Sequence, residues 1–186
     1  MKTAACAAGL MAGLFFCHDV PADDWVVDHD ASHLGFVATY DEIPFEGRFN
    51  DFDARIRFDP DTPSEGSFIV NVNITSVDTN SPDRDQGMLE TEWFDASRHP
   101  RASFESSRFE RLQGENTYTV TGDLAIKGIA RPITAIFLWT RSGDAAQLKG
   151  SADVRRGDFD IGTGDWSDDD TIGFDVRIEF SLTLTK

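Results

Sequence analysis

The sequence predicts an all-β protein with one short helical segment, in which about eight antiparallel strands form a closed barrel or a sandwich. Three observations predict this. Apolar and polar residues alternate along most of the chain, turn-forming residues separate the alternating stretches, and one stretch has a helical spacing of apolar residues. The chain has 186 residues, 40% of them hydrophobic, which is enough apolar material for one packed domain.

The clearest strand is the C-terminal one, where Ile172, Phe174 and Val176 begin an apolar series that alternates with polar or small residues. One face of this run is wholly apolar, as expected of an antiparallel strand with one solvated side. Turns such as Lys127-Gly128 separate the strands. The expected strands, in chain order, cover residues 34–40, 52–58, 68–75, 102–110, 118–126, 132–141, 147–155 and 172–185.

The helical segment is predicted between Asp83 and Ala96. Ser81 is a typical N-cap residue, and a proline follows at the first helical position. Leu89 and Trp93 lie four residues apart, which is a helical spacing. A glycine inside the stretch weakens a helix, so we expect one or two short turns.

The interior of the sheet allows two interpretations. Small residues occupy several positions on the apolar faces, namely Ala38, Ala54, Gly122, Ala135, Gly150 and Ala152. They either interdigitate with large side chains in a dry, filled core, or they leave room for a ligand. A barrel of about eight strands is just wide enough for one small ligand.

The N-terminal residues 1–22 are predicted to be a signal peptide, which leaves a single domain over residues 23–186. Lys2 precedes an apolar run over residues 4–16 that is shorter than the roughly 20 residues needed to cross a bilayer. Small residues then favour cleavage after Ala22. In the alternative, a lipoprotein, cleavage would precede Cys17. Both cysteines, Cys6 and Cys17, lie in this segment, so a chain cleaved after Ala22 has no thiol chemistry.

The charge excludes one class of partner and the motifs offer no catalytic centre. The chain has 17 Lys and Arg against 33 Asp and Glu, a net charge of −16, which argues against nucleic-acid binding. We find no nucleophile elbow, no zinc-protease motif and no phosphate loop in the sequence, so we expect neither an enzyme nor a cofactor.

Two groups of residues are weak candidates for a metal site. Asp165, Asp168, Asp169 and Asp170 offer carboxylates that Ca²⁺ prefers, but they lack the spacing of an EF-hand, so a solvated loop is the favoured interpretation. The histidines that remain after cleavage are His29, His33 and His99. We expect these to be surface residues and predict no metal site.

An ordered series of short motifs resembles the YceI-like family of exported, lipocalin-like barrels. The series comprises Gly47-Arg48-Phe49 before Phe52, Thr75-Ser76-Val77-Asp78-Thr79-Asn80, Arg84-Asp85, Leu89, Trp93-Phe94-Asp95, Pro100, Phe104-Glu105-Ser106, Gly122-Asp123-Leu124, Gly128 with Arg131-Pro132, and Arg156 with Asp158-Phe159. The resemblance implies an extended antiparallel barrel whose apolar lumen holds a polyisoprenoid or a similar lipid. Ala31 and Tyr40 stand where the family often has histidines. We therefore expect no function that depends on those two histidines in this chain.

The resemblance and the alternation together select the candidate ligand-binding residues. The expected wall of the lumen consists of Phe36, Phe104, Leu124, Phe137, Trp139, Val154, Phe174 and Val176. Arg84 would hold the phosphate of a head group, or it would form a structural ion pair with Asp85. Arg155 and Arg156, next to Asp158, allow the same two interpretations.

Three functions remain open from the sequence. The first is an exported, periplasmic protein that shelters a polyisoprenoid, such as a quinone precursor or an undecaprenyl-type carrier. The second is a filled barrel that engages a membrane-bound partner, such as a b-type cytochrome of electron transport. The third is an enzyme acting on a lipid. A homodimer is compatible with each of these, and a nucleic-acid partner with none.

Overall fold

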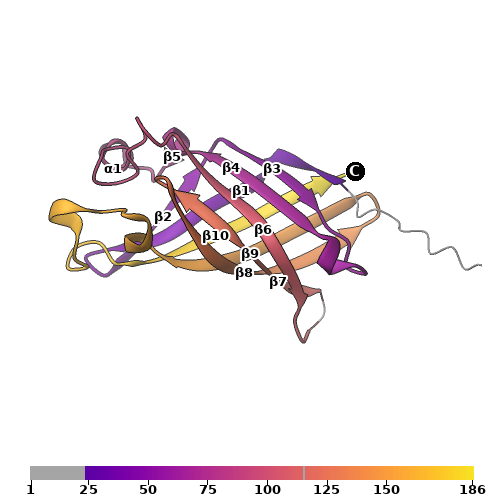
Figure 1. The fold of residues 1–186 in the computed structure, drawn as a ribbon. Helices are drawn as coiled ribbons and strands as arrows, with labels where there is room; N and C mark the ends of the chain where they lie inside the picture. Colours follow the sequence, from indigo (N-terminus) through magenta and orange to yellow (C-terminus); the bar gives the residue numbers. More distant parts are fainter. Residues whose placement is uncertain (1–23, 115) are drawn as a thin grey trace, which may run out of the picture.

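The computed structural model describes residues 24–114 and 116–186, which fold into one closed antiparallel barrel (Figure 1). The strands are β1 (Asp24–Tyr40), β2 (Ile43–Phe49), β3 (Phe52–Arg57), β4 (Ser67–Asn73), β5 (Val77–Asp78), β6 (Arg101–Arg111), β7 (Thr117–Ile126), β8 (Ile129–Ser142), β9 (Ala145–Arg155) and β10 (Asp175–Thr185). The barrel closes because β10 pairs with β1.

Eight positions around the barrel accommodate these strands. β2 and β3 follow one another along the same side of β1, since both pair with it, and β5 and β4 pair with β2 and β3 in turn. The predicted barrel of about eight antiparallel strands is therefore confirmed.

The structure corrects several of the predicted strands. β1 begins at Asp24 instead of residue 34, and its pairing with β10 shifts register between Asp28 and His33. This irregularity breaks the alternation that would have revealed the first half of the strand. β2 and β5 were not predicted at all. β8 begins at Ile129 instead of residue 132, and β10 begins at Asp175 instead of residue 172.

The helical segment is α1 (Pro82–Met88), which confirms one short helix after Ser81. The Ser81 side chain makes no capping bond. Instead, the backbone N–H and hydroxyl of Thr79 donate to Oδ1 of Asp85, at 2.8 and 2.6 Å. Four 3₁₀ turns complete the fold: η1 (Pro63–Glu65), η2 (Ile74–Ser76), η3 (Arg156–Phe159) and η4 (Gly164–Trp166).

The two ends of the barrel differ. α1 and the loop that carries η4 project from one end, which we call the loop end, whereas the C-terminus lies at the other (Figure 1). Near the C-terminus, at what we call the closed end, the barrel is filled by an aromatic plug of Trp25, Phe58, Phe68, Phe109, Tyr118, Phe137 and Trp139. Phe58 is its centre, with its ring 5.0 Å from the rings of Tyr118 and Trp139.

The predicted signal peptide, residues 1–22, lies outside the described residues. Across residues 24–114 and 116–186, no helix has the length and apolar character to span a bilayer.

Candidate functional site

A cavity of about 500 Å³ occupies the half of the barrel toward the loop end. Its wall is almost entirely apolar and is built by inward-facing side chains of the strands, among them Phe36, Val70, Phe104, Ile133, Val154 and Ile178. We call this cavity the lumen. A volume of this size is in the usual range for small-molecule sites, about 300–1,000 Å³.

The structure brings six of the nine predicted site residues to the lumen. Phe36, Phe104, Leu124, Val154, Val176 and Arg84 all line it. Phe137, Trp139 and Phe174 are not among the lining residues, so their predicted positions in the wall are corrected here.

Phe137 and Trp139 belong to the aromatic plug. They are inward-facing, as the alternation predicts, and each is only 1% exposed. However, β8 runs the length of the barrel, so Ile133 and Ala135 reach the lumen while Phe137 and Trp139 lie beyond it. Phe174 precedes β10, and the guanidinium carbon of Arg156 lies 4.9 Å from the centre of its ring.

Three glycines hold phenylalanine rings against the barrel wall. A Cβ atom at Gly47 would lie 2.3 Å from the ring of Phe36, and one at Gly122 would lie 2.7 Å from the ring of Phe104. Phe180 covers Gly150, its cross-strand partner, in the same way. Rings that cover glycines on the neighbouring strand leave the centre of the barrel open.

The small residues therefore act in two ways. Ala38, Ala135 and Ala152 line the lumen, as the hollow interpretation predicts. Gly122 and Gly150 do not, because aromatic rings occupy the space above them. Ala54 is also not a lining residue, although Phe52 and Ile56 on the same face of β3 are; it is packed in the hydrophobic core.

Arg84 lies at the loop end of the lumen, where its guanidinium carbon is 4.3 Å from the centre of the Phe45 ring. The predicted ion pair with Asp85 does not form, and Asp85 instead accepts two hydrogen bonds from Thr79. Within residues 24–114 and 116–186, the Arg84 guanidinium forms no salt bridge, and it lines the loop end of the apolar cavity together with Asp83.

Arg156 has the structural role that its sequence context left open. It is only 4% exposed, and it donates to the carbonyl oxygens of Ile161, Gly162, Asp168, Ile172 and Gly173. Burial lowers the pKa of this guanidinium, and the charges of Asp168 and Asp169 act in the opposite direction. Arg156 thereby fixes the loop between β9 and β10. Its neighbour Arg155 is exposed and lies 3.9 Å from a carboxylate oxygen of Asp175.

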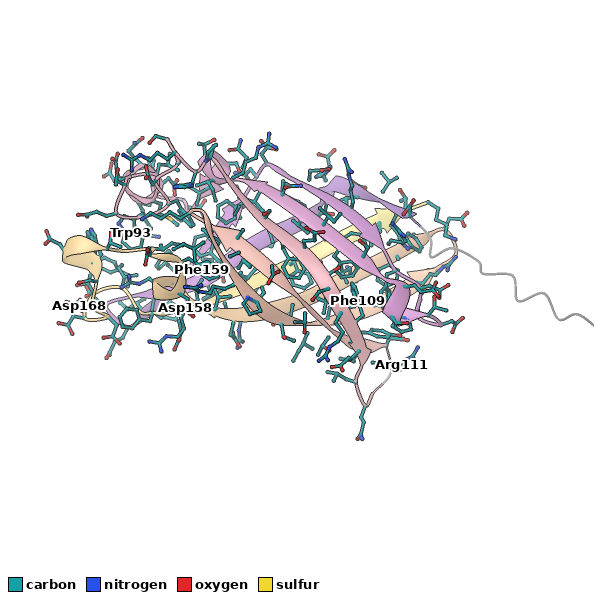
Figure 2. The ribbon with its side chains drawn as sticks, in the orientation of Figure 1. Trp93, Phe109, Arg111, Asp158, Phe159 and Asp168 are labelled. Carbon is teal, nitrogen blue, oxygen red and sulfur yellow. The ribbon has the colours of Figure 1, made fainter. Side chains whose placement is uncertain are left out.

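The two segments over the loop end are tied to each other. The rings of Trp93 and Trp166 lie 5.6 Å apart, and the backbone N–H groups of Gly162 and Thr163 both donate to the carbonyl oxygen of Glu92. Lys127 also donates to carbonyl oxygens on both segments. Figure 2 shows Trp93 and Phe159 near this end, and Phe109 and Arg111 toward the closed end.

In the part of the chain that the structure describes, no cluster of three or more His, Asp or Glu side chains has an arrangement suited to a metal ion. This holds for the aspartates between residues 165 and 170. The ring of His29 packs 5.3 Å from that of Phe52, and His99 lies beside the turn at Gly128.

β2 and the loops also contribute to the lumen, which the sequence did not predict. Phe45 and Phe49 of β2 line the lumen, as do Met88, Trp93 and Phe159 from the loop end. A period-2 signal was present in β2, where Phe45, Gly47 and Phe49 point inward. The loop residues carried no comparable signal, because their positions depend on contacts between segments far apart in the sequence.

Comparisons with known proteins agree with this architecture. A UPF0312 protein of Pseudomonas aeruginosa (strain LESB58) is 30% identical over 170 residues, covering 87% of this chain and 88% of its own. The crystal structure of Burkholderia cenocepacia BcnA matches with a TM-score of 0.82 and 32% identity, over 85% of this chain and 99% of its own.

A more distant structure shares the fold. A polyisoprenoid binding domain from Saccharophagus degradans, implicated in plant cell wall breakdown, has a TM-score of 0.66 and 15% identity, over 87% of this chain and 97% of its own. The family model described as the YceI-like domain matches residues 25–184. The chain therefore belongs to the YceI-like family.

Proposed function

We propose that the protein is exported to the periplasm and holds a polyisoprenoid, or a similar long apolar chain, in its lumen. The observation that carries the proposal is the apolar cavity of about 500 Å³ inside a closed barrel. The polyisoprenoid binding domain with the same fold supports this ligand class. The signal-peptide pattern of residues 1–22 supports export.

The energetics favour a long chain over a short one. Each buried methylene group contributes about 0.8 kcal/mol, so ten of them contribute on the order of 8 kcal/mol. Association costs roughly 4–15 kcal/mol in lost freedom, so a short chain would bind weakly. A preformed lumen reduces this cost because the wall does not have to reorganise.

Arg84 is the proposed partner of a polar or anionic head group. Its guanidinium is stacked on Phe45 and lines the loop end of the lumen, so a chain bound with its head group at this end places that group beside Arg84. Guanidinium groups bind phosphates and carboxylates through paired hydrogen bonds. A quinone-like head group would accept hydrogen bonds from the same donors.

The cavity argues against the alternative of a filled barrel. That alternative required side chains to occupy the whole interior, whereas they do so only at the closed end. A membrane-bound partner or a second copy of the chain remains compatible with a protein that carries a lipid.

The proposal is tested by lipid extraction and mass spectrometry of the purified protein, and by calorimetric titration with geranylgeraniol. Ala152→Phe places a ring in the lumen, and Gln147→Phe adds the same ring on the outer face of the same strand. Gly150 is unsuitable for this purpose, because a Cβ atom there would lie 2.3 Å from the carbonyl oxygen of Ile136.

We expect the unaltered protein and Gln147→Phe to bind the chain, and Ala152→Phe to lose binding while its melting temperature shows that it folds. Protein that neither carries nor takes up an apolar chain would refute the proposed function. Export is tested separately by the intact mass of the periplasmic form, which should correspond to a chain that begins at Asp23.

A further inference from the structure

The barrel wall contains a seam where β8 and β9 separate. The two strands pair from Ser142 and Ala145 up to Ile136 and Ser151, where the ladder ends. Beyond this point β8 continues along β7 as far as Ile129, and β9 continues along β10 as far as Arg155. Each strand therefore keeps one neighbour and leaves the edge that faces the other strand unpaired.

The unpaired region forms a groove. If the register continued, Ile133 would face Val154 and Pro132 would face Arg155. Instead, these residues line a hollow of about 310 Å³ on the barrel wall, together with residues of η3. The proline at position 132 has no N–H to donate, which suits a strand edge without a partner.

The groove and the lumen share a wall that is one side chain thick. Ile133, Val154 and Phe159 line both cavities. Phe159 is 1% exposed and belongs to η3, which directly follows β9. Figure 2 shows Phe159 beside Asp158, which lines the groove. Three apolar side chains, and no backbone ladder, therefore separate the lumen from the groove.

We propose that this seam is a lateral portal through which the apolar chain of the ligand enters and leaves the lumen. The inference rests on the proposed lipid binding and adds the route. Opening the seam requires side-chain rotations of Ile133, Val154 and Phe159, because the ladder between β8 and β9 has already ended there.

The loop end is the competing route, and it is braced. The contact of Trp93 with Trp166 and the backbone bonds to Glu92 join the two segments that cover it. Arg156 holds one of these segments through five carbonyl oxygens. A chain that entered between these two segments would have to break these hydrogen bonds, whereas the seam opens without breaking a backbone hydrogen bond.

The rim of the groove is charged. A charged rim does not hold an apolar chain stably, so the groove fits a path to the lumen better than a second binding site. Arg131, Asp153, Arg155, Asp158 and Asp175 surround the apolar residues of the seam. Asp153 is held by Arg177, whose hydrogen bond lowers the pKa of that carboxyl, so the rim keeps its charge near neutral pH. An amphiphile could keep its head group in water at this rim while its tail passes inward.

Stopped-flow fluorescence with cis-parinaric acid tests the route. Thr134 lies on the outer face of β8 and lines the groove, so Thr134→Trp places an indole over the seam. Thr140→Trp is the matched control, since Thr140 is exposed on the same strand where β8 is paired with β9. Thr134→Val controls for the lost contact with Thr121.

We expect Thr134→Trp to slow association and dissociation of the probe by the same factor, at least about fivefold, with an equilibrium affinity within about twofold. Thr140→Trp and Thr134→Val should keep the rates of the unaltered protein. Phe159→Leu should raise the association rate, since a mere loss of contact with the ligand in the lumen would raise the dissociation rate alone.

The outcomes distinguish failure of the portal from failure of the proposed lipid binding. Normal affinity with equal rates in Thr134→Trp and Thr140→Trp overturns the portal and leaves the proposed function intact. Failure of the unaltered protein to bind the probe overturns both. Should Thr134→Trp fail to fold, rates for Phe159→Leu that change only in dissociation overturn the portal as well.

Discussion

Replacing Arg156 by methionine should release the loop between β9 and β10. Methionine keeps much of the length of the side chain and removes all its donors. Three of the arginine's hydrogen bonds are buried, to the carbonyl oxygens of Ile161, Gly162 and Ile172, at 2.9, 3.0 and 2.9 Å. The substitution leaves these three acceptors without their partner.

The magnitude follows from the cost of leaving these carbonyl groups unpaired. Each buried acceptor that loses its partner costs about 1–3 kcal/mol. Because the loop can move and admit water, we expect the lower part of this range, on the order of 3 kcal/mol in the free energy of unfolding. With a urea dependence of about 2 kcal/mol per molar, the midpoint of unfolding would fall by about 1.5 M.

Arg155→Met is the matched control for this experiment. Arg155 is the adjacent arginine, but it is exposed and its carboxylate partner, Asp175, lies 3.9 Å away. Surface ion pairs of this kind contribute about 1 kcal/mol or less. Urea unfolding of both variants gives the comparison, and hydrogen exchange at Gly162, which donates to Glu92, reports on the loop itself.

We expect Arg156→Met to lower the unfolding midpoint far more than Arg155→Met and to speed exchange at Gly162. An unfolding free energy within about 1 kcal/mol of the control, together with unchanged exchange, would contradict the assignment of Arg156 as the residue that fixes the loop.

Three further predictions concern other parts of the barrel. Gly47→Ala should destabilise the protein, because its Cβ atom would lie 2.3 Å from an aromatic ring, whereas Gly87→Ala in α1 meets nothing within 4 Å and should be neutral or stabilising by up to about 1 kcal/mol in thermal unfolding. Asp78 accepts from the backbone of Asn80 and from Arg48, which lowers the pKa of this carboxyl, so its contribution to stability is present at neutral pH and is lost as the pH falls below its ordinary value of 3.8. Urea midpoints of the unaltered protein and Asp78→Asn should therefore differ at pH 7 and converge in acid; a constant difference would count against this linkage. Phe137→Ala should cost about 3–5 kcal/mol in the free energy of unfolding and leave the affinity of the folded protein for geranylgeraniol unchanged, since the ring belongs to the plug; a large loss of affinity would place it in the binding site.

The sequence predicted those parts of the fold that depend on local pattern. Alternation identified the inward face of β8 and β10, and the Ser81-Pro82 pair located the start of α1. Where the alternation is interrupted, as between Asp28 and His33, the prediction lost half of β1. A bulge changes which residues face inward, and only pairing with β10 shows that the strand continues.

The candidate site was predicted only in part, because its residues too depend on how neighbouring strands are placed. Alternation determines whether a side chain points inward but not its height along the barrel. Phe104 and Phe137 both point inward from long strands, yet Phe104 lines the lumen and Phe137 fills the closed end. Height depends on the stagger of neighbouring strands, which a single sequence does not display.

The amino-acid sequence by itself determined the all-β class, the faces of most strands and the short helix, because each depends on residues near one another in the chain. The tertiary structure alone decided that the interior is hollow at one end and solid at the other, that Arg156 binds carbonyl groups and not a carboxylate, and that β8 and β9 part at Ile136. These features arise where distant segments meet, so their physical cause is packing between strands and not the preference of any residue.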